Sequence, residues 1–305
     1  VAIAPHDGLF SAHGMILKAK PNVILPDYLP FLMISDYFMN RAVEISVGSL
    51  SPTVNWSTLR QEKFSIPPLD HQRRISDILW RVDEVLLSLE GLKEKLNQIL
   101  LITRNTFFTT HSKASTKRVD ELFEVQLGKM LSPKAHTGTN PLPYLTNRNV
   151  QWGRFDLTEV SEMDFSQDEY KKFHLEPNDL LVCEGGEVGR CAIWDNQIAT
   201  CCFQKALHRL RSLNSEYSSE LMLEFMLWGG ETGMFASLTG HSTIAHLTAI
   251  KLKGMKVPII GVEQRTNFLV RMSEIRSSIK AISNHISNIE KLRIVLLNRL
   301  IGEPL

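Results

Sequence analysis

Two long apolar stripes constrain the fold of this sequence more than any other feature. Apolar residues recur in alternating steps of four and three from Ile78 to Ile99, and again from Ile275 to Leu300, where Arg293 interrupts the pattern. On an isolated helix each stripe would lie in water, so the two helices are expected to pack against each other. Because a whole domain lies between them in the sequence, an antiparallel arrangement is favoured.

The two helices are long. Residues 72–108 and 263–301 would each form a helix of roughly 55 Å at about 1.5 Å per residue. The alternative is that each helix only covers its own domain, but apolar heptads sustained over several turns argue for a helix pair.

An internal repeat sets the domain organisation. Residues 1–3 match residues 191–193 at an offset of 190, and Gln72-Arg73 matches Gln264-Arg265 at an offset of 192. In both copies a proline-marked strand end precedes the long helix. The sequence therefore predicts one module twice, a globular domain followed by a helix, with only the rear part of the first domain represented.

The predicted fold is α+β: two β-rich domains, the first partial, separated by a pair of long antiparallel coiled-coil helices. Between the helices, short apolar runs bounded by Gly, Pro, Asn and Asp indicate strands, and residues 219–227 indicate a helix. We expect a first domain at 1–70, a spacer helix at 71–112, a second domain at 113–262 and a C-terminal spacer helix at 263–305.

Composition excludes several classes of protein. No apolar run approaches the roughly 18 to 20 residues of a membrane span and no signal-peptide pattern opens the sequence, so we expect a cytoplasmic protein without a membrane partner. The four cysteines show no paired CxxC spacing, which argues against a disulfide framework or a metal site. With 34 basic and 33 acidic residues, net charge decides nothing.

The local distribution of charge is uneven. Residues 151–187 are strongly acidic and both flanks are basic. One interpretation is ordinary solvated loops. The other is a cationic face, opposed by an acidic back, that orients the domain on a phosphate backbone.

Three stretches imitate catalytic motifs and fail. Residues 140–144 approach the Asn-Pro-Pro-Tyr loop of adenine methyltransferases, but Leu142 is inserted and no nucleotide-binding turn accompanies them. Residues 169–171 offer the Glu-x-Lys of nucleases outside a strand end, and residues 184–190 lack Gly-Lys-Ser/Thr and carry acids that would repel a triphosphate. These stretches therefore give little support to an independent enzyme, which remains the least favoured hypothesis.

Polar loops with glycine favour nucleic-acid binding instead. They combine close backbone approach with amide, hydroxyl and guanidinium groups that suit base edges and phosphates. Any one of these loops could simply be a tight turn with solvated polar groups. Their concentration in one domain is what favours nucleic-acid binding. The loops are Gly128–Ser132, Asn147–Gln151, Gly185–Arg190 and Gln204–Lys205.

These stretches, with Tyr144–Gly153, Asn178–Val182, Ser242–Leu247 and the boundary Ile66–Arg73, resemble a specificity subunit of a type I restriction-modification system. The resemblance implies two target recognition domains that read the halves of a split site in double-stranded DNA, with the helices as a ruler. It also implies a non-catalytic chain without its own cofactor. S-adenosylmethionine, ATP and Mg²⁺ would be held by partners, which are DNA methyltransferase subunits and a restriction/translocase subunit.

The residues expected to contact DNA fall into three groups. Cations for phosphates or guanines are Lys129, Arg148, Arg190, Lys205 and Arg209. Amides for base edges are Asn149, Gln151 and Gln204. Supporting positions are Ser132, Gly186, Gly189, Ser242, Thr243 and His246. The competing hypothesis is a coiled-coil assembly scaffold, or an inactive fragment of such a subunit, that does not contact DNA.

Overall fold

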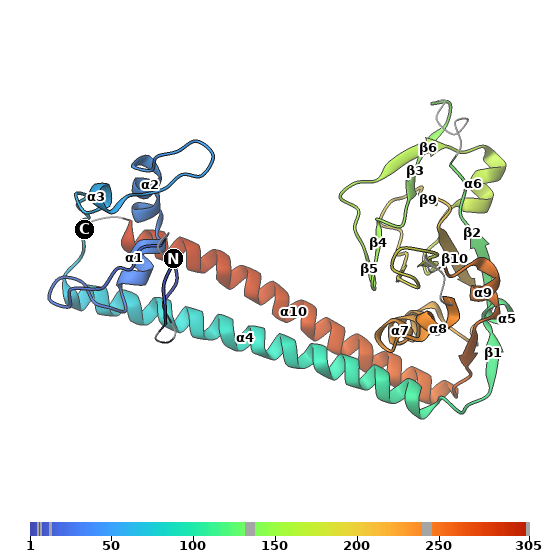
Figure 1. The fold of residues 1–305 in the computed structure, drawn as a ribbon. Helices are drawn as coiled ribbons and strands as arrows, with labels where there is room; N and C mark the ends of the chain where they lie inside the picture. Colours follow the sequence, from blue (N-terminus) through green and yellow to red (C-terminus); the bar gives the residue numbers. More distant parts are fainter. Residues whose placement is uncertain (5, 7, 12–13, 132–137, 240–245, 303–305) are drawn as a thin grey trace. The chain divides into compact units, whose positions relative to one another are not determined.

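The computed structural model describes residues 1–4, 6, 8–11, 14–131, 138–239 and 246–302 (Figure 1). It divides into two compact units. The first comprises Val1–Gln98 with Arg276–Leu305, and the second comprises Ile99–Ile275. Among the described residues, no helix is both long and apolar enough to cross a membrane.

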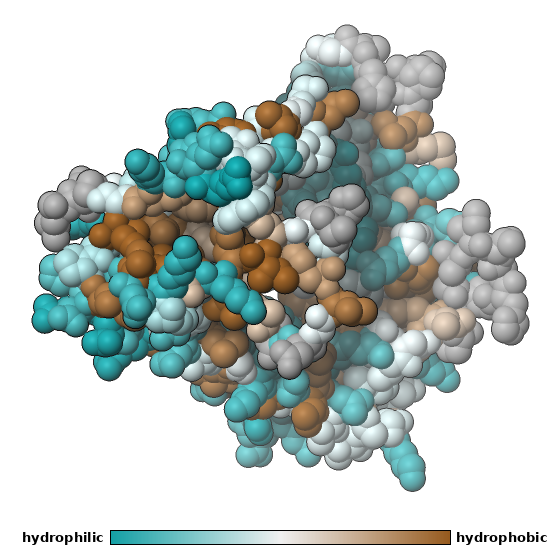
Figure 2. All heavy atoms as spheres, turned by 60° about the vertical axis from the view of Figure 1, so that its left-hand side comes forward, coloured by the Kyte–Doolittle hydropathy of each residue, from teal (hydrophilic) through white to brown (hydrophobic). Residues whose placement is uncertain are grey.

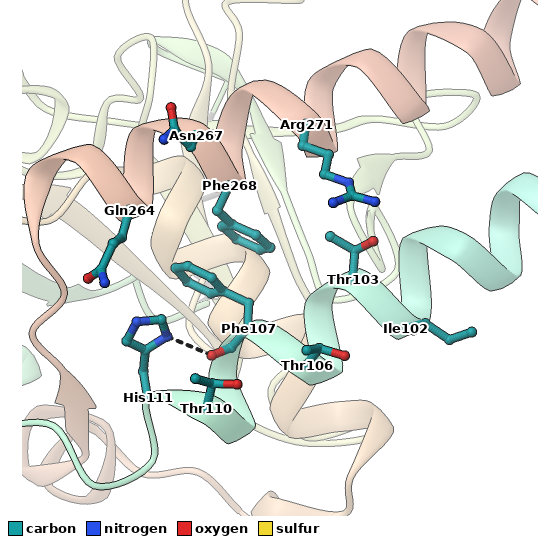
Figure 3. Close-up of a pocket in the computed structure, with 10 residues that line it drawn as sticks. All are labelled: Ile102, Thr103, Thr106, Phe107, Thr110, His111, Gln264, Asn267, Phe268 and Arg271. Atoms are coloured by element: carbon teal, nitrogen blue, oxygen red, sulfur yellow. Dashed lines mark hydrogen bonds between the residues drawn. The ribbon is translucent and has the colours of Figure 1, made fainter.

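Two helices dominate the chain. Helix α4 spans Leu69–Thr110 and helix α10 spans Val262–Ile301, 42 and 40 residues respectively. Asp83 of α4 pairs with Arg293 of α10 in the first unit, whereas Phe107 stacks on Phe268 in the second, with ring centroids 3.8 Å apart (Figure 3). Within the first unit, Leu79 packs in one core with Leu297, and Asp83, one turn further along α4, pairs with Arg293, one turn earlier on α10, which confirms the antiparallel pair.

Arg293 does not break the helix, although it interrupts the apolar stripe. Its guanidinium donates to both carboxylate oxygens of Asp83, and both side chains are about three-quarters buried. The sequence pattern shows a gap in the stripe because the partner lies 210 residues away.

Four strands form the main sheet of the second unit. All neighbours are antiparallel, in the order β2, β10, β7, β8. The strands are β2 (Phe123–Leu127), β7 (Leu180–Cys183), β8 (Cys191–Ile193) and β10 (Leu207–Ser212).

A three-stranded sheet lies beside it in the same unit, in the order β6, β3, β9, and its β3 and β9 are parallel. Its strands are β3 (Pro141–Leu145), β6 (Ser161–Asp164) and β9 (Cys202–Phe203). Two further pairs join β1 (Thr116–Arg118) to β11 (Lys256–Pro258) and β4 (Val150–Gln151) to β5 (Arg154–Phe155).

Strand β7 separates two hydrophobic cores. Leu180 and Val182 pack in one core, and Leu181 and Cys183 pack in the other. Because successive side chains of a strand point to opposite faces, an unbroken apolar run is what a strand buried on both faces requires. The first of these cores also contains helix α7 (Ser219–Glu231), which confirms the predicted helix at 219–227.

Shorter helices complete the second unit. They are α5 (Val119–Leu122), α6 (Gln167–Phe173), α8 (Met234–Thr239) and α9 (Ala249–Gly254). Arg104, near the end of α4, is 2% exposed and pairs with Glu224 and Glu231 of α7. This buried ion pair ties the long helix to the domain core.

The first unit is helical where strands were expected. Helices α1 (Leu29–Ile34), α2 (Asp36–Glu44) and α3 (Trp56–Leu59) precede α4, and the described part of residues 1–70 holds one isolated bridge, Val47 to Thr53, but no strand. The internal repeat explains why the expected strands are missing. Segments equivalent to β8 and β10 occur here, but the strands that pair with them in the second unit, β2 and β7, have no counterpart within residues 1–70.

A small core holds the first unit together. Tyr28, Phe31 and Leu32 pack with Leu79 of α4 and Leu297 of α10. Several apolar side chains within residues 1–16 remain exposed. Figure 2 shows brown patches between hydrophilic residues on one face of the molecule. The exposed apolar residues of this segment include Val1, Ile3, Leu9, Phe10 and Ile16.

Candidate nucleic-acid interface

Four polar loops that the sequence singles out meet in the second unit. The first follows β2, the second runs from the end of β3 into β4, the third connects β7 to β8, and the fourth connects β9 to β10. The first to fourth loops comprise residues 128–131, 147–151, 185–190 and 204–205.

Backbone hydrogen bonds hold the first loop against the fourth. The Lys129 amide donates to the Phe203 carbonyl at 3.1 Å, and the Lys205 amide donates to the Lys129 carbonyl at 2.7 Å. The Gln204 amide donates to the Leu145 carbonyl at 3.0 Å, at the end of β3. Three segments distant in sequence are thereby fixed at one place.

Asn147 joins the second loop to the third. Its side-chain amide donates to the Gly185 carbonyl at 3.2 Å, and its own carbonyl accepts from Arg190 at 2.7 Å. The Leu247 amide donates to the Glu184 carbonyl at 2.7 Å, which adds the segment after α8. The four loops thus form one hydrogen-bonded surface, which we call the loop cluster.

Glycine is required at two positions of the loop cluster. A Cβ atom on Gly128 would lie 2.3 Å from the backbone carbonyl carbon and oxygen of Gln204, closer than any real contact. Gly189 has a φ of +81°, and a Cβ there would meet the ring of Phe235 at 2.5 Å. Gly186, with a φ of +73°, is exposed and has open space around it.

Arg148 and Lys205 present cations to solvent. The Arg148 side chain is 67% exposed and pairs at 2.9 Å with Glu159, which is 74% exposed, so solvent screens this contact. Lys205 is exposed, and Gln151 is half-buried and donates to the Arg148 carbonyl. These three residues are placed where a polyanion could reach them.

Arg190 and Gln204 are half-buried. One Arg190 nitrogen pairs with Glu187 at 3.2 Å, and its Nε is buried without a hydrogen-bond partner among the described residues. His246 is exposed beside the cluster. Three further expected contacts, Ser132, Ser242 and Thr243, lie outside the described residues.

Lys129 was expected at DNA, but the structure places it inside the domain. Its ammonium group donates to the Asp164 carbonyl at 2.6 Å and to the Glu169 carboxylate at 2.8 Å, and it lies over the Phe165 ring. The hydrogen bond from Lys129 holds the pKa of Glu169 below its ordinary value. A buried cation with these partners anchors the first loop.

Asn149 is likewise buried and fully hydrogen-bonded. Its side-chain oxygen accepts from the amide and the hydroxyl of Thr146, and its nitrogen donates to the carbonyls of Asp156 and Glu159. A base edge could reach this amide only if these bonds broke. The structure therefore assigns Asn149 to shaping the second loop.

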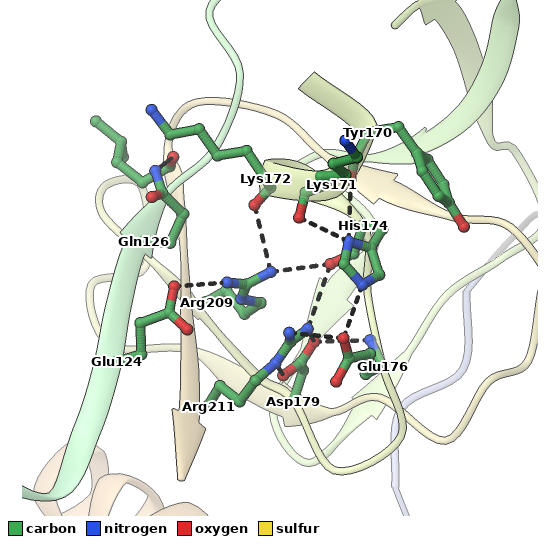
Figure 4. Close-up of polar contacts among 11 residues, drawn as sticks. Glu124, Gln126, Tyr170, Lys171, Lys172, His174, Glu176, Asp179, Arg209 and Arg211 are labelled. Carbon is green, nitrogen blue, oxygen red and sulfur yellow. Dashed lines mark hydrogen bonds and ion pairs between the residues drawn. The ribbon is translucent and has the colours of Figure 1, made fainter. Parts of the chain in front are cut away.

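Arg209 lies on the central strand β10 and is also buried. It donates to the carbonyls of Lys172 and His174 and pairs with Glu124 at 3.0 Å (Figure 4). Burial lowers the pKa of its guanidinium. Arg209 therefore supports the sheet rather than facing a ligand.

The neighbouring Arg211 forms ion pairs with two carboxylates of the acidic stretch, residues 151–187. It binds both carboxylate oxygens of the buried Asp179 at 2.7 Å and one oxygen of Glu176 at 2.7 Å (Figure 4). Burial raises the pKa of Glu176, but the bond from His174 and the charge of Arg211 outweigh it and lower that pKa. These acids neutralise internal arginines, so the acidic stretch is not simply an acidic back.

The contributions of Asn147 and Glu159 were not foreseen. Asn147 lies within a stretch that the sequence singles out, but its role as a bridge depends on two residues about 40 positions away.

No group of three His, Cys, Asp or Glu side chains that could hold a metal occurs among the described residues.

Comparison with known proteins places this architecture in context. Residues 1–100 match the family model of the type I restriction modification DNA specificity domain. A curated relative, the type I restriction enzyme MjaX specificity subunit of Methanocaldococcus jannaschii, is 23% identical over 99% of this chain and 74% of its own length.

Solved structures share the fold at low sequence identity. A structure described as the basis of complex assembly and conformational transition of the type I R-M system has a TM-score of 0.62 at 15% identity, covering 91% of this chain and 71% of its own. The S subunit from M. genitalium gives 0.54 at 14%, covering 94% and 75%. The HsdS subunit from Thermoanaerobacter tengcongensis gives 0.51 at 16%, covering 92% and 70%.

Proposed function

We propose that this chain is a specificity subunit of a type I restriction-modification system and reads one half of a split DNA target through the loop cluster of residues 113–262. DNA sequence recognition is the role of that family, and the matches of the preceding section support it. The observation that carries the location is the meeting of four polar loops, two of them with glycine, on one hydrogen-bonded surface.

The loop cluster suits DNA because its exposed groups can contact the duplex while its buried groups fix the loops. Arg148, in an exposed pair with Glu159, and the exposed Lys205 can approach phosphates or guanines, and Gln151 and Gln204 can offer amides to base edges. Buried groups, of which Lys129 is the clearest, hold the loops in place before DNA arrives. Such preorganisation lowers the entropic cost of binding.

The helices supply spacing. Uninterrupted helices of 42 and 40 residues are each about 60 Å long, and two of them packed together resist bending better than one. In this proposal they set the separation between the two halves of the target, with an unspecified spacer between them.

Chemistry is assigned to partner subunits. We infer that DNA methyltransferase subunits bring S-adenosylmethionine and modify adenines, and that a restriction/translocase subunit brings ATP and Mg²⁺. Support comes from the three motifs that fail as catalytic sites and from a similar structure whose title concerns assembly of the type I R-M system. This chain would direct both activities to one sequence.

Co-expression with the methyltransferase subunits tests the proposal. Methylated adenines mapped genome-wide should define a short sequence read by residues 113–262, and a split motif would mean that both domains read DNA. An assembled complex that methylates without sequence preference, or does not methylate at all, would contradict the proposal and favour the scaffold hypothesis.

Single substitutions then locate the contacts. Arg148→Ala should cost about 1 to 3 kcal/mol of discrimination at one base pair if the guanidinium binds guanine, whereas Lys205→Ala should weaken all sequences alike and flatten the salt dependence by about one unit. Lys256→Ala, an exposed lysine on β11, is the matched control and should behave as wild type. If neither Arg148 nor Lys205 alters binding by the complex, the loop cluster is not the DNA-binding surface.

A further inference from the structure

The described part of the first loop includes two exposed apolar residues at 130 and 131. Met130 is 63% exposed and Leu131 is 42% exposed. Between residues 113 and 261, the other described large apolar residues that are this exposed are Leu213, after β10, and Ile250, on α9, and both lie outside the loop cluster. An apolar tip within a surface of cations and amides therefore needs an explanation.

The backbone below Met130 is fixed. The carbonyl and amide of Lys129 are bonded to the fourth loop and its ammonium group is held by Glu169, while Gly128 fits against Gln204 without room for a Cβ. The tip is thus presented from a rigid base rather than from a loop free to fold inward. Exposing it leaves apolar surface in water unless a ligand covers it.

Base edges in the major groove offer hydrogen-bond donors, acceptors and a single apolar group, the C5-methyl of thymine. The loop cluster contains partners for the first two kinds in Arg148, Gln151 and Gln204. We propose that Met130 is a specificity-determining residue that contacts the C5-methyl group of a thymine in the half-site bound by residues 113–262. This inference rests on the proposed function, and it adds a base type that the half-site must contain.

Deoxyuridine provides the test, because it pairs as thymine does but lacks the methyl group. The complex with its methyltransferase subunits is titrated with duplexes of the mapped target in which each thymine of the half-site is replaced in turn. For the wild-type complex, the Kd should rise about fourfold at one position, the value of one buried methyl-sized group. For Met130→Ser, the Kd should already be raised on the thymine duplex and should not rise further with deoxyuridine.

Leu213→Ser is the matched control, since Leu213 is a similarly exposed apolar residue outside the loop cluster. This variant should keep the wild-type response to deoxyuridine, and thermal unfolding of all three proteins checks that they fold alike. If Met130→Ser still loses affinity with deoxyuridine, or if the wild-type complex binds its target specifically but ignores every replacement, Met130 does not read a methyl group. Absence of specific binding by the wild-type complex would instead overturn the proposed function itself.

Discussion

Replacing Arg104 with methionine should destabilise the second unit more than any other single charge removal in the helix pair. The Arg104 guanidinium is 2% exposed and donates to Glu224, whose side chain is 5% exposed, at 2.8 Å. Arg104→Met removes a charged partner from that buried carboxylate, whereas Glu231 is one-third exposed and can turn to water. Breaking a buried pair from one side costs about 3 to 5 kcal/mol.

The expected loss corresponds to a fall in Tm on the order of 10 °C for a domain of this size. Scanning calorimetry of the full chain measures it. The double variant Arg104→Met/Glu224→Met removes both buried charges and should recover much of the loss. Arg293→Met, which breaks a pair with about one-quarter of each side chain exposed, should cost much less. An Arg104→Met variant as stable as wild type, or a double variant worse than the single one, would refute the reasoning.

Two further predictions concern the base of the loop cluster. Burial holds the pKa of His208 below its ordinary value, and its Nε2 bonds the Leu247 carbonyl at 3.0 Å. The unfolded chain therefore binds the extra proton first, and stability should be complete above about pH 6.5 and fall as the pH drops below it; denaturant titrations from pH 7.5 to 5 should show this slope in wild type and not in His208→Gln. Gly128→Ala should cost about 1 to 3 kcal/mol because the new Cβ overlaps the Gln204 backbone. Gly254→Ala, with open space around it, should be neutral in the same unfolding assay, and equal stability of the two variants would contradict the packing argument.

The long helices could be predicted because their pattern is local. Ranges of 72–108 and 263–301 from periodicity compare with Leu69–Thr110 and Val262–Ile301 in the structure. Periodicity could not show that Arg293 has a partner, since the meaning of an isolated charge in an apolar stripe depends on the facing helix.

The sequence does not show which polar side chains are buried. Lys129, Asn149 and Arg209 lie among polar neighbours in the sequence, where nothing distinguishes a solvated side chain from one bonded across the fold. Their partners are 35 to 40, three to ten and 35 to 85 positions away, respectively. The loops that carry them could be predicted as a group, but the orientation of each side chain could not.

The absence of strands from the described part of residues 1–70 has a different cause. A strand exists only with a neighbour, so the same kind of segment that forms β10 between β2 and β7 in the second unit stays irregular in the first. Propensity within the segment does not carry that information.

The ion pair between Asp83 and Arg293 has a consequence for measurement along DNA. A pair of helices with uniform apolar stripes could slide by one heptad, about 10 Å, and still bury apolar side chains against each other. Such a slip would separate Arg293 from Asp83 and place the Asp83 carboxylate opposite Leu300 or Ile286 of α10. This ion pair thus favours one alignment of the two helices, and for the split target proposed above a slip of 10 Å would correspond to about three base pairs.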